Sequence, residues 1–267
     1  MTTPLLAVEK LEVTYQRAIT AVQGITLSVE RGRIVALLGT NGAGKTTTLR
    51  AISGFLGIDD ARVTEGAIVF NGERIENRLP HEITRRGIVL APERDKVFPN
   101  LTVAENLAAP VPRRGNAAER KRLEAAVYQF FPRLGDLRNR LGGLLSGGER
   151  QMLAMASALV CAPELLLVDE LSLGLAPVVV EDLMRRLVEI RRELDLAVLL
   201  VEQSAAFALA VADYGYVLEN GRVVLDGSAK RLRHHADIQE FYLGQAAGER
   251  RSYRDVKQYR RSRRWYG

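Results

Sequence analysis

The chain has 267 residues, of which 47% are apolar and 26% are charged, so it can bury a full core as one large α/β domain or as a domain with a sizeable insert. No apolar stretch approaches the ~18 residues that a membrane-spanning helix needs, and residues 1–10 lack the features of a secretory signal, which together favour a cytosolic location. The formal net charge of +6 is confined to the C-terminal end, and the single cysteine, Cys161, excludes an internal disulfide and is expected to pack in the core.

The first part of the chain is predicted to form a β-rich layer. Alternating apolar runs at residues 25–29 and 34–38 are joined by a short polar turn and predict a hairpin. A second hairpin is predicted where residues 67–70 and 73–75 flank Asn71-Gly72, because this dipeptide favours tight two-residue turns.

A glycine-rich stretch follows the run at residues 34–38 and fits G-x-x-x-x-G-K-[ST] at every defined position. Its residues, which we expect to cradle a nucleoside triphosphate, are Gly39, Thr40, Asn41, Gly42, Ala43, Gly44, Lys45, Thr46 and Thr47. The glycines let backbone N–H groups turn inward, and the following helix adds roughly half a positive charge at its N-terminus. Lys45 would reach the β- and γ-phosphates, and Thr46 would offer its hydroxyl to Mg²⁺. A plain turn between a strand and a helix would need neither side chain.

The middle of the chain is predicted to be a helical insert. Thr102 and Glu105 have the spacing of a capping box, and Asn116 with Glu119 is predicted to begin a longer helix. The apolar face of that helix would consist of Leu123, Val127, Phe130 and Phe131, before Pro132 ends it. Residues 147–159 also have a helical pattern.

Strands and helices then alternate. A buried strand at residues 165–168 ends in Asp169-Glu170, a helix follows Pro177, and another buried strand covers residues 197–201. A short helix near residues 205–212 and a hairpin about Asn220-Gly221 complete the pattern. Alternation of this kind predicts a mostly parallel sheet with helices on both faces.

Two of these segments carry further chemistry. Asp169 would be a ligand of Mg²⁺, and Glu170 would polarise the attacking water. If no phosphate loop preceded them, the alternative would be that these two acidic residues form a helix cap or a surface pair. Ser146, Gly147 and Gly148 stand at the start of a predicted helix and would form a second anion site, with a serine-capped helix start as the alternative.

Together these motifs resemble the ATP-binding subunits of ABC transporters over about residues 6–244. Within that family, residues 39–54, 92–107, 172–177 and 199–203 look like the subunits that drive uptake of branched-chain amino acids. The resemblance implies an ATPase on the cytoplasmic face of the cell membrane that pairs with a homologous ATP-binding subunit and with integral membrane permease subunits, and indirectly with a solute-binding protein. It also implies ATP and Mg²⁺ as cofactors, Tyr15 stacking on adenine, and ATP held between the phosphate loop of one subunit and the Ser146 motif of the other.

Some positions depart from the general family pattern. Glu93 stands where a glutamine usually links the γ-phosphate and metal to the membrane partner, and Gln203 stands where a histidine usually follows the last core strand; both look usual for the amino-acid branch. Ala176 likewise replaces a frequent aspartate. Leu171 stands where a proline normally follows the catalytic glutamate, so we expect a looser turn around Glu170.

The expected organisation is therefore a nucleotide-binding α/β core with its β layer at residues 1–87 and 162–244, a helical subdomain at 88–161, and a basic tail at 245–267. The eight basic residues of that tail would suit an anionic membrane surface. Two alternatives stay open: an ABC-type ATPase whose tail, with four aromatic residues, binds nucleic acid, and a catalytically weak regulatory partner.

Overall fold

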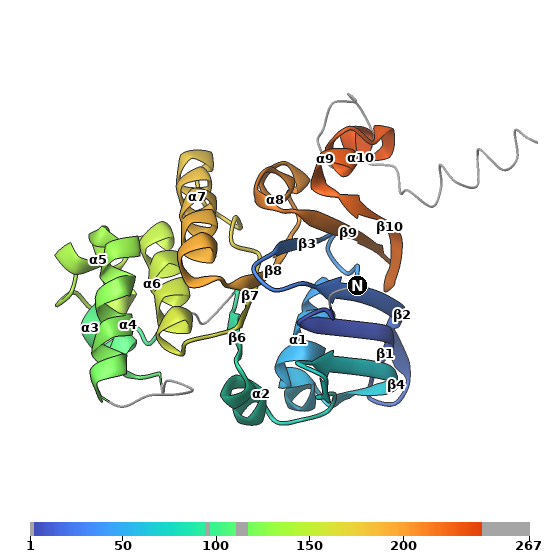
Figure 1. Cartoon of the computed structure of the whole chain (residues 1–267), viewed down its shortest axis with the longest axis horizontal. Helices are drawn as coiled ribbons and strands as arrows, with labels where there is room; N and C mark the ends of the chain where they lie inside the picture. Colours follow the sequence, from blue (N-terminus) through green and yellow to red (C-terminus); the bar gives the residue numbers. More distant parts are fainter. Residues whose placement is uncertain (1–2, 94–96, 111–116, 242–267) are drawn as a thin grey trace, which may run out of the picture.

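The computed structural model describes residues 3–93, 97–110 and 117–241, whose strands form two sheets (Figure 1). The antiparallel sheet has the order β2-β1-β4-β5 and consists of β1 (Leu6–Tyr15), β2 (Ile19–Val29), β4 (Ala61–Phe70) and β5 (Glu73–Arg74). The larger sheet has the order β10-β9-β3-β8-β7-β6 and consists of β3 (Ile34–Gly39), β6 (Ile88–Ala91), β7 (Leu165–Asp169), β8 (Ala197–Glu202), β9 (Tyr214–Glu219) and β10 (Arg222–Ser228). All its pairings are parallel except the β9–β10 hairpin, so the expected mostly parallel sheet with an antiparallel β layer is confirmed.

Six of the described α-helices begin and end close to the predicted signals, and four, at residues 80–86, 132–136, 229–233 and 236–241, were not predicted. The described helices are α1 (Lys45–Ser53), α2 (Pro80–Arg86), α3 (Val103–Ala108), α4 (Ala117–Phe130), α5 (Pro132–Asp136), α6 (Gly147–Val160), α7 (Pro177–Leu194), α8 (Ala205–Val211), α9 (Ala229–Arg233) and α10 (Ala236–Phe241). Helices α3 to α6 gather at one end of the molecule, away from the antiparallel sheet (Figure 1). Thr102 and Ser146 begin α3 and α6 with the reciprocal hydrogen bonds of a capping box. The prediction for Asn116 and the basic tail at 245–267 lie outside the described residues.

The first predicted hairpin is wrong. Strand β2 pairs with β1 in the antiparallel sheet, whereas β3 lies in the larger sheet between β8 and β9. The reason is burial: all six residues of β3 are buried, which is typical of a strand covered on both faces, whereas β2 has exposed and half-buried positions between its buried ones. The turn that joins them therefore carries the chain from one sheet to the other.

The larger sheet divides the core into two parts. Residues 34, 36 and 38 of β3 belong to the part of the core that also contains buried residues of helices α3 to α10, and residues 35 and 37 belong to the part that contains α1 and the antiparallel sheet. Side chains of one strand alternate between faces, so a single strand supports both parts of the core. This arrangement fixes β3, and with it the loop that follows, from both sides.

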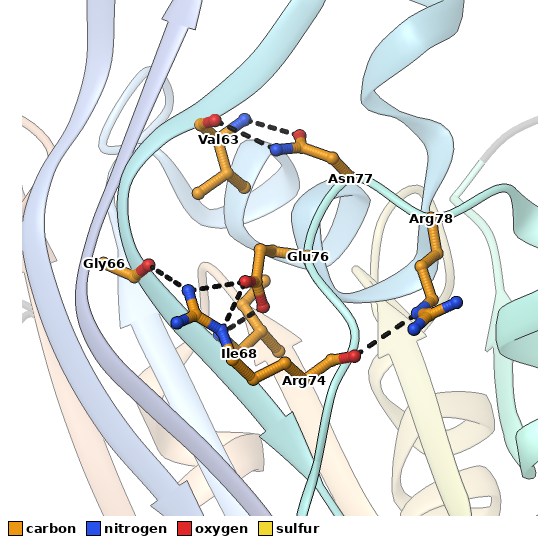
Figure 2. A network of polar contacts seen from close by, with 7 residues as sticks. All are labelled: Val63, Gly66, Ile68, Arg74, Glu76, Asn77 and Arg78. Atoms are coloured by element: carbon orange, nitrogen blue, oxygen red, sulfur yellow. Dashed lines mark hydrogen bonds and ion pairs between the residues drawn. The ribbon is translucent and has the colours of Figure 1, made fainter.

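The outer edge of β4 is covered largely by side chains (Figure 2). Its partner β5 has only two residues, and beyond it the Asn77 amide both accepts from the Val63 N–H at 2.9 Å and donates to the Val63 carbonyl at 3.0 Å. Glu76 accepts from the Ile68 N–H at 3.3 Å, and hydrogen bonds at this carboxylate lower its pKa against the opposing effect of burial. Side chains thus occupy backbone groups that would otherwise offer an open sheet edge.

Candidate functional site

The predicted chemical residues follow four neighbouring strands. Strands β3, β8, β7 and β6 are adjacent in that order and parallel, so their carboxyl ends share one edge of the sheet. The phosphate loop follows β3, Gln203 follows β8, Glu170 follows β7 and Glu93 lies two residues beyond β6. In open parallel sheets this edge is where ligands bind.

The phosphate loop has a backbone that requires its glycines. A Cβ on Gly39 would lie 2.7 Å from the Leu218 carbonyl oxygen, and Gly42 and Gly44 have φ angles of 80° and 101°, which other residues rarely adopt. Gly44 begins α1 without any side-chain cap, so this end of the helix presents its backbone N–H groups without a competing side chain. Thr40, Asn41 and Gly42 are exposed, and Ala43 is buried beneath them, which leaves the outer side of the loop open to an anion.

Lys45 lies almost fully buried at the centre of this edge, with 4% of its side chain exposed. Its Nζ donates to the carbonyl oxygens of Gly39 at 2.9 Å and Thr40 at 3.1 Å, and it lies 3.2 Å from Oε1 of Glu170. A buried cation without such partners would be strongly destabilising. The lysine is therefore held in place by the same carboxylate that was predicted to activate water.

Asp169 adds a second carboxylate beside this pair. Its Oδ1 accepts from the Thr46 hydroxyl at 3.5 Å, and burial, followed by the charges of Glu170 and Glu93, raises its pKa to about 6, against the opposing effect of Lys45. The carboxylates of Glu170 and Asp169 thus both interact with Lys45. The influence of Glu93 on the pKa of Asp169 also places Glu93 in this group.

The donors here fit a hard divalent cation. Among the residues that the structure describes, no three His, Cys, Asp or Glu side chains converge closely enough to form a metal cage. Mg²⁺ does not require one, because it is usually held by one or two carboxylates together with phosphate oxygens and water. A hydroxyl and carboxylates with excess negative charge, next to a phosphate loop, match that pattern.

Glu170 is fixed by its backbone. Its φ angle of 46° lies in the left-handed region, which is uncommon for a residue other than glycine. Its N–H donates to the Val201 carbonyl at 2.9 Å, and its carbonyl accepts from the Leu173 N–H at 3.3 Å. Leu171 is fully buried in the core, so the residue that replaces proline here anchors the turn by packing.

The two remaining residues predicted for this site differ in their surroundings. Tyr15, at the end of β1, is half-buried, and its hydroxyl lies 3.2 Å from Oγ1 of Thr47, which puts an aromatic ring beside the phosphate loop. Gln203 is exposed just beyond β8. The structure therefore places Tyr15 against the loop and leaves Gln203 at the surface.

The Ser146 motif forms a separate site at the start of α6, which lies apart from α1 in Figure 1. The Ser146 Oγ accepts from the Glu149 N–H at 3.3 Å, and the Ser146 N–H donates to Oε2 of Glu149 at 2.9 Å, the main cause of the lowered pKa of Glu149. Arg133 donates to the other oxygen of Glu149 at 3.1 Å. A Cβ on Gly148 would lie 2.7 Å from Val179 Cγ1, so this glycine allows α6 to pack closely against α7.

Sequence reasoning missed Glu202, the last residue of β8, which is fully buried and binds Ser172. The signal was present, because Glu202 ends an apolar strand in the same way that Asp169 ends the neighbouring one.

A glycine-rich phosphate loop, a buried lysine and carboxylates at the carboxyl edge of a parallel sheet define a phosphate-loop ATPase. The sequence profile described as ABC transporter matches residues 22–172, and the chain belongs to this family as an ATP-binding subunit of an ABC transporter that hydrolyses ATP.

Known relatives agree with this assignment. The chain is 38% identical to the high-affinity branched-chain amino acid transport ATP-binding protein BraG of Pseudomonas aeruginosa, over 90% of the chain and 100% of the relative. It is 32% identical to the lipopolysaccharide export system ATP-binding protein LptB of Haemophilus influenzae, over 90% and 98%. Among solved structures, a nucleotide-free ATP-binding cassette from an ABC transporter aligns with a TM-score of 0.77 at 26% identity, over 92% of this chain and 100% of that one.

In the described ranges no helix has both the length and the apolar character to cross a bilayer.

Proposed function

We propose that this chain powers an ABC importer for branched-chain or related amino acids. The observation that carries the proposal is the convergence of Lys45, Asp169 and Glu170 at the open edge of the sheet, beside the glycine loop. The solute class is supported by the likeness to BraG, which is greater than the likeness to LptB. Lipopolysaccharide export is the second candidate because that relative is also covered almost end to end.

Hydrolysis follows from the positions of the side chains. ATP places its phosphates on the N-terminus of α1, with adenine beside Tyr15 and the β- and γ-phosphates at Lys45. Thr46, Asp169 and Glu93 would hold Mg²⁺, which neutralises charge on the phosphates. When the γ-phosphate takes over Lys45, the Glu170 carboxylate loses its ion pair and becomes available to orient and polarise water.

The second anion site acts in a dimer. Ser146, Gly147 and Gly148 bind the γ-phosphate of an ATP held by the phosphate loop of a second, homologous subunit. ATP then closes the pair, and hydrolysis reopens it, so that binding energy becomes conformational work. Gln203 directly follows β8, and Glu93 lies two residues beyond β6. From these positions both side chains respond to the γ-phosphate and pass its presence on to neighbouring elements.

The membrane partner is an integral permease. Phe98 and Leu144 are 59% and 62% exposed, and Leu141 is also exposed. Backbone hydrogen bonds from Gly142 to Leu101 and from Gly143 to Pro99 hold the segments that carry these side chains together. Exposed apolar side chains on these two joined segments are suited to contact with a permease segment, with the chain peripheral on the cytoplasmic face.

Transport assays test the proposal. The complex is co-purified from native membranes, placed in proteoliposomes and supplied with the solute-binding protein that accompanies it, radiolabelled leucine and ATP on the cytoplasmic side. ATP-dependent leucine uptake that disappears in a Glu170→Gln complex is the expected result. ATP-dependent extraction of lipopolysaccharide without leucine uptake would instead favour the second candidate.

A further inference from the structure

Glu202 is a buried carboxylate with an unusual set of partners. None of its surface is exposed, yet Oε1 accepts from the Ser172 N–H at 2.9 Å and Oε2 accepts from the Ser172 hydroxyl at 2.6 Å. The Gln203 backbone also hydrogen-bonds this carboxylate. An acidic side chain is costly to bury unless hydrogen bonds compensate it, and here both oxygens are used on one residue of the loop that follows Glu170.

The loop after β7 needs such support. Glu170 has a left-handed φ of 46°, and the residue after it is a leucine, whose own φ angle no ring fixes. The Glu170 N–H on Val201 and Ser172 on Glu202 attach the loop to the end of β8, and the Leu171 side chain is buried in the core. The bond between the Ser172 hydroxyl and the Glu202 carboxylate joins two side chains, so it can be removed without changing the backbone of β7 or β8.

We propose that Glu202 is a positioning residue for ATP hydrolysis, which clamps Ser172 and thereby holds the Glu170 carboxylate beside Lys45 and the phosphate loop. The proposal rests on the assignment of Glu170 as the group that activates water. Because Glu202 precedes Gln203 directly, the clamp also joins the Glu170 turn to the end of β8. A displacement of about 1 Å at a water-activating group lowers the reaction rate by as much as ~10²-fold. Loss of the clamp is therefore expected to lower the rate of hydrolysis by up to this factor.

The test separates positioning from general stability. Ser172→Ala removes only the hydroxyl and is expected to lower kcat about tenfold while the Kd for ATP stays within about twofold, since the phosphate loop and Asp169 are untouched. Ser172→Thr keeps the hydroxyl and is expected to restore the parental kcat. Glu202→Ala is expected to lower kcat about 100-fold.

Matched controls lie away from the site. Ser228→Ala removes a hydroxyl that accepts from the Arg231 N–H, and Glu76→Gln alters a carboxylate that accepts from the Ile68 N–H. Both are expected to keep the parental kcat. If kcat falls equally in these controls, the clamp proposal is overturned, because a general loss of stability would then explain the lower kcat.

Glu170→Gln is measured in parallel. If Glu170→Gln hydrolyses ATP at the parental rate, the assignment of the water-activating group is wrong and the clamp proposal falls with it. If Glu170→Gln is inactive but Ser172→Ala keeps the parental kcat, the clamp alone is overturned. Since Ser172→Ala is a conservative change at a partly exposed residue, the test does not depend on whether Glu202→Ala folds.

Discussion

The helix start at α1 carries a buried cation and has no side-chain cap, whereas the start of α6 is capped by Ser146 and Glu149 and has its cation, Arg133, at the surface. Both follow the same local pattern of glycines at a helix N-terminus. At α1 the backbone groups and Lys45 are ready for an anion, but at α6 the serine and the glutamate already satisfy each other. We therefore propose that the first site binds phosphate by itself, while the second adds to a phosphate that another subunit presents.

Replacing the carboxylate at the first site gives the largest expected effect. Glu170→Gln should lower steady-state ATP hydrolysis by roughly 10²–10⁴-fold, because the amide does not polarise water as a carboxylate does. ATP should still bind, since Lys45 and Asp169 remain. Phosphate release and nucleotide binding are measured side by side; a parental rate would show that water is activated elsewhere.

The cations of the two sites provide a direct contrast. Lys45→Met should weaken ATP binding to the isolated chain by about 100-fold, the effect of losing a buried charge-assisted contact. Arg133→Met removes the cation beside the second site, which is more than half exposed, and should leave that affinity unchanged. Titration with a fluorescent ATP analogue measures both. Equal losses would contradict the idea that only the first site binds ATP by itself.

Asp169 makes the first site dependent on pH. Because burial and neighbouring carboxylates raise its pKa from 3.8 to about 6 in the folded state, ionisation of this group opposes folding. The penalty is fully present above about pH 6 and is relieved as the pH falls towards about 4. Without nucleotide, Asp169→Asn should therefore be more stable than the parent at pH 7, by about 3 kcal/mol, and this difference should shrink at pH 5. Urea unfolding of both proteins at the two pH values measures it, and a constant difference would contradict the shifted pKa.

The smallest expected effect concerns the capped site. Ser146→Ala should lower the free energy of unfolding by about 1 kcal/mol through loss of the cap, and leave ATP affinity of the isolated chain unchanged. Its hydrolysis should fall only at concentrations where the parent dimerises. Ser228→Ala, which removes a similar cap from α9, serves as the control for stability alone. Weaker ATP binding in the Ser146 variant would mean that the second site contributes within one chain.

Local signals in the sequence predicted much of this arrangement. The capping box of Thr102, the helix that begins after Ser146, the loop around Lys45 and the acidic end of β7 depend on neighbours within a few residues, and the structure has them as expected. The serine cap at Ser146 was only the alternative interpretation of that motif, and the structure has it. The roles assigned to these residues in catalysis stay predictions.

What the sequence did not predict depends on distant partners. The β2–β3 hairpin is wrong because alternation and turn residues do not reveal which sheet a strand joins. Glu202 was missed because a strand-ending acid acquires its meaning only from Ser172, which lies thirty residues earlier in the chain. Likewise the group formed by Glu93 and Asp169 exists only because β6 and β7 are neighbours in the sheet.

The position of β3 has a consequence for biosynthesis. Ile34 pairs with Val198, and Val35 with Tyr214, so the central strand emerges from the ribosome long before either partner has been translated. At about 5–20 residues per second, the delay is of the order of ten seconds or more. During that time the antiparallel sheet can form from nearby segments, but the apolar residues of β3 remain without their partners. Nascent chains paused before β8 should therefore associate with chaperones through the segment that later supports the phosphate loop.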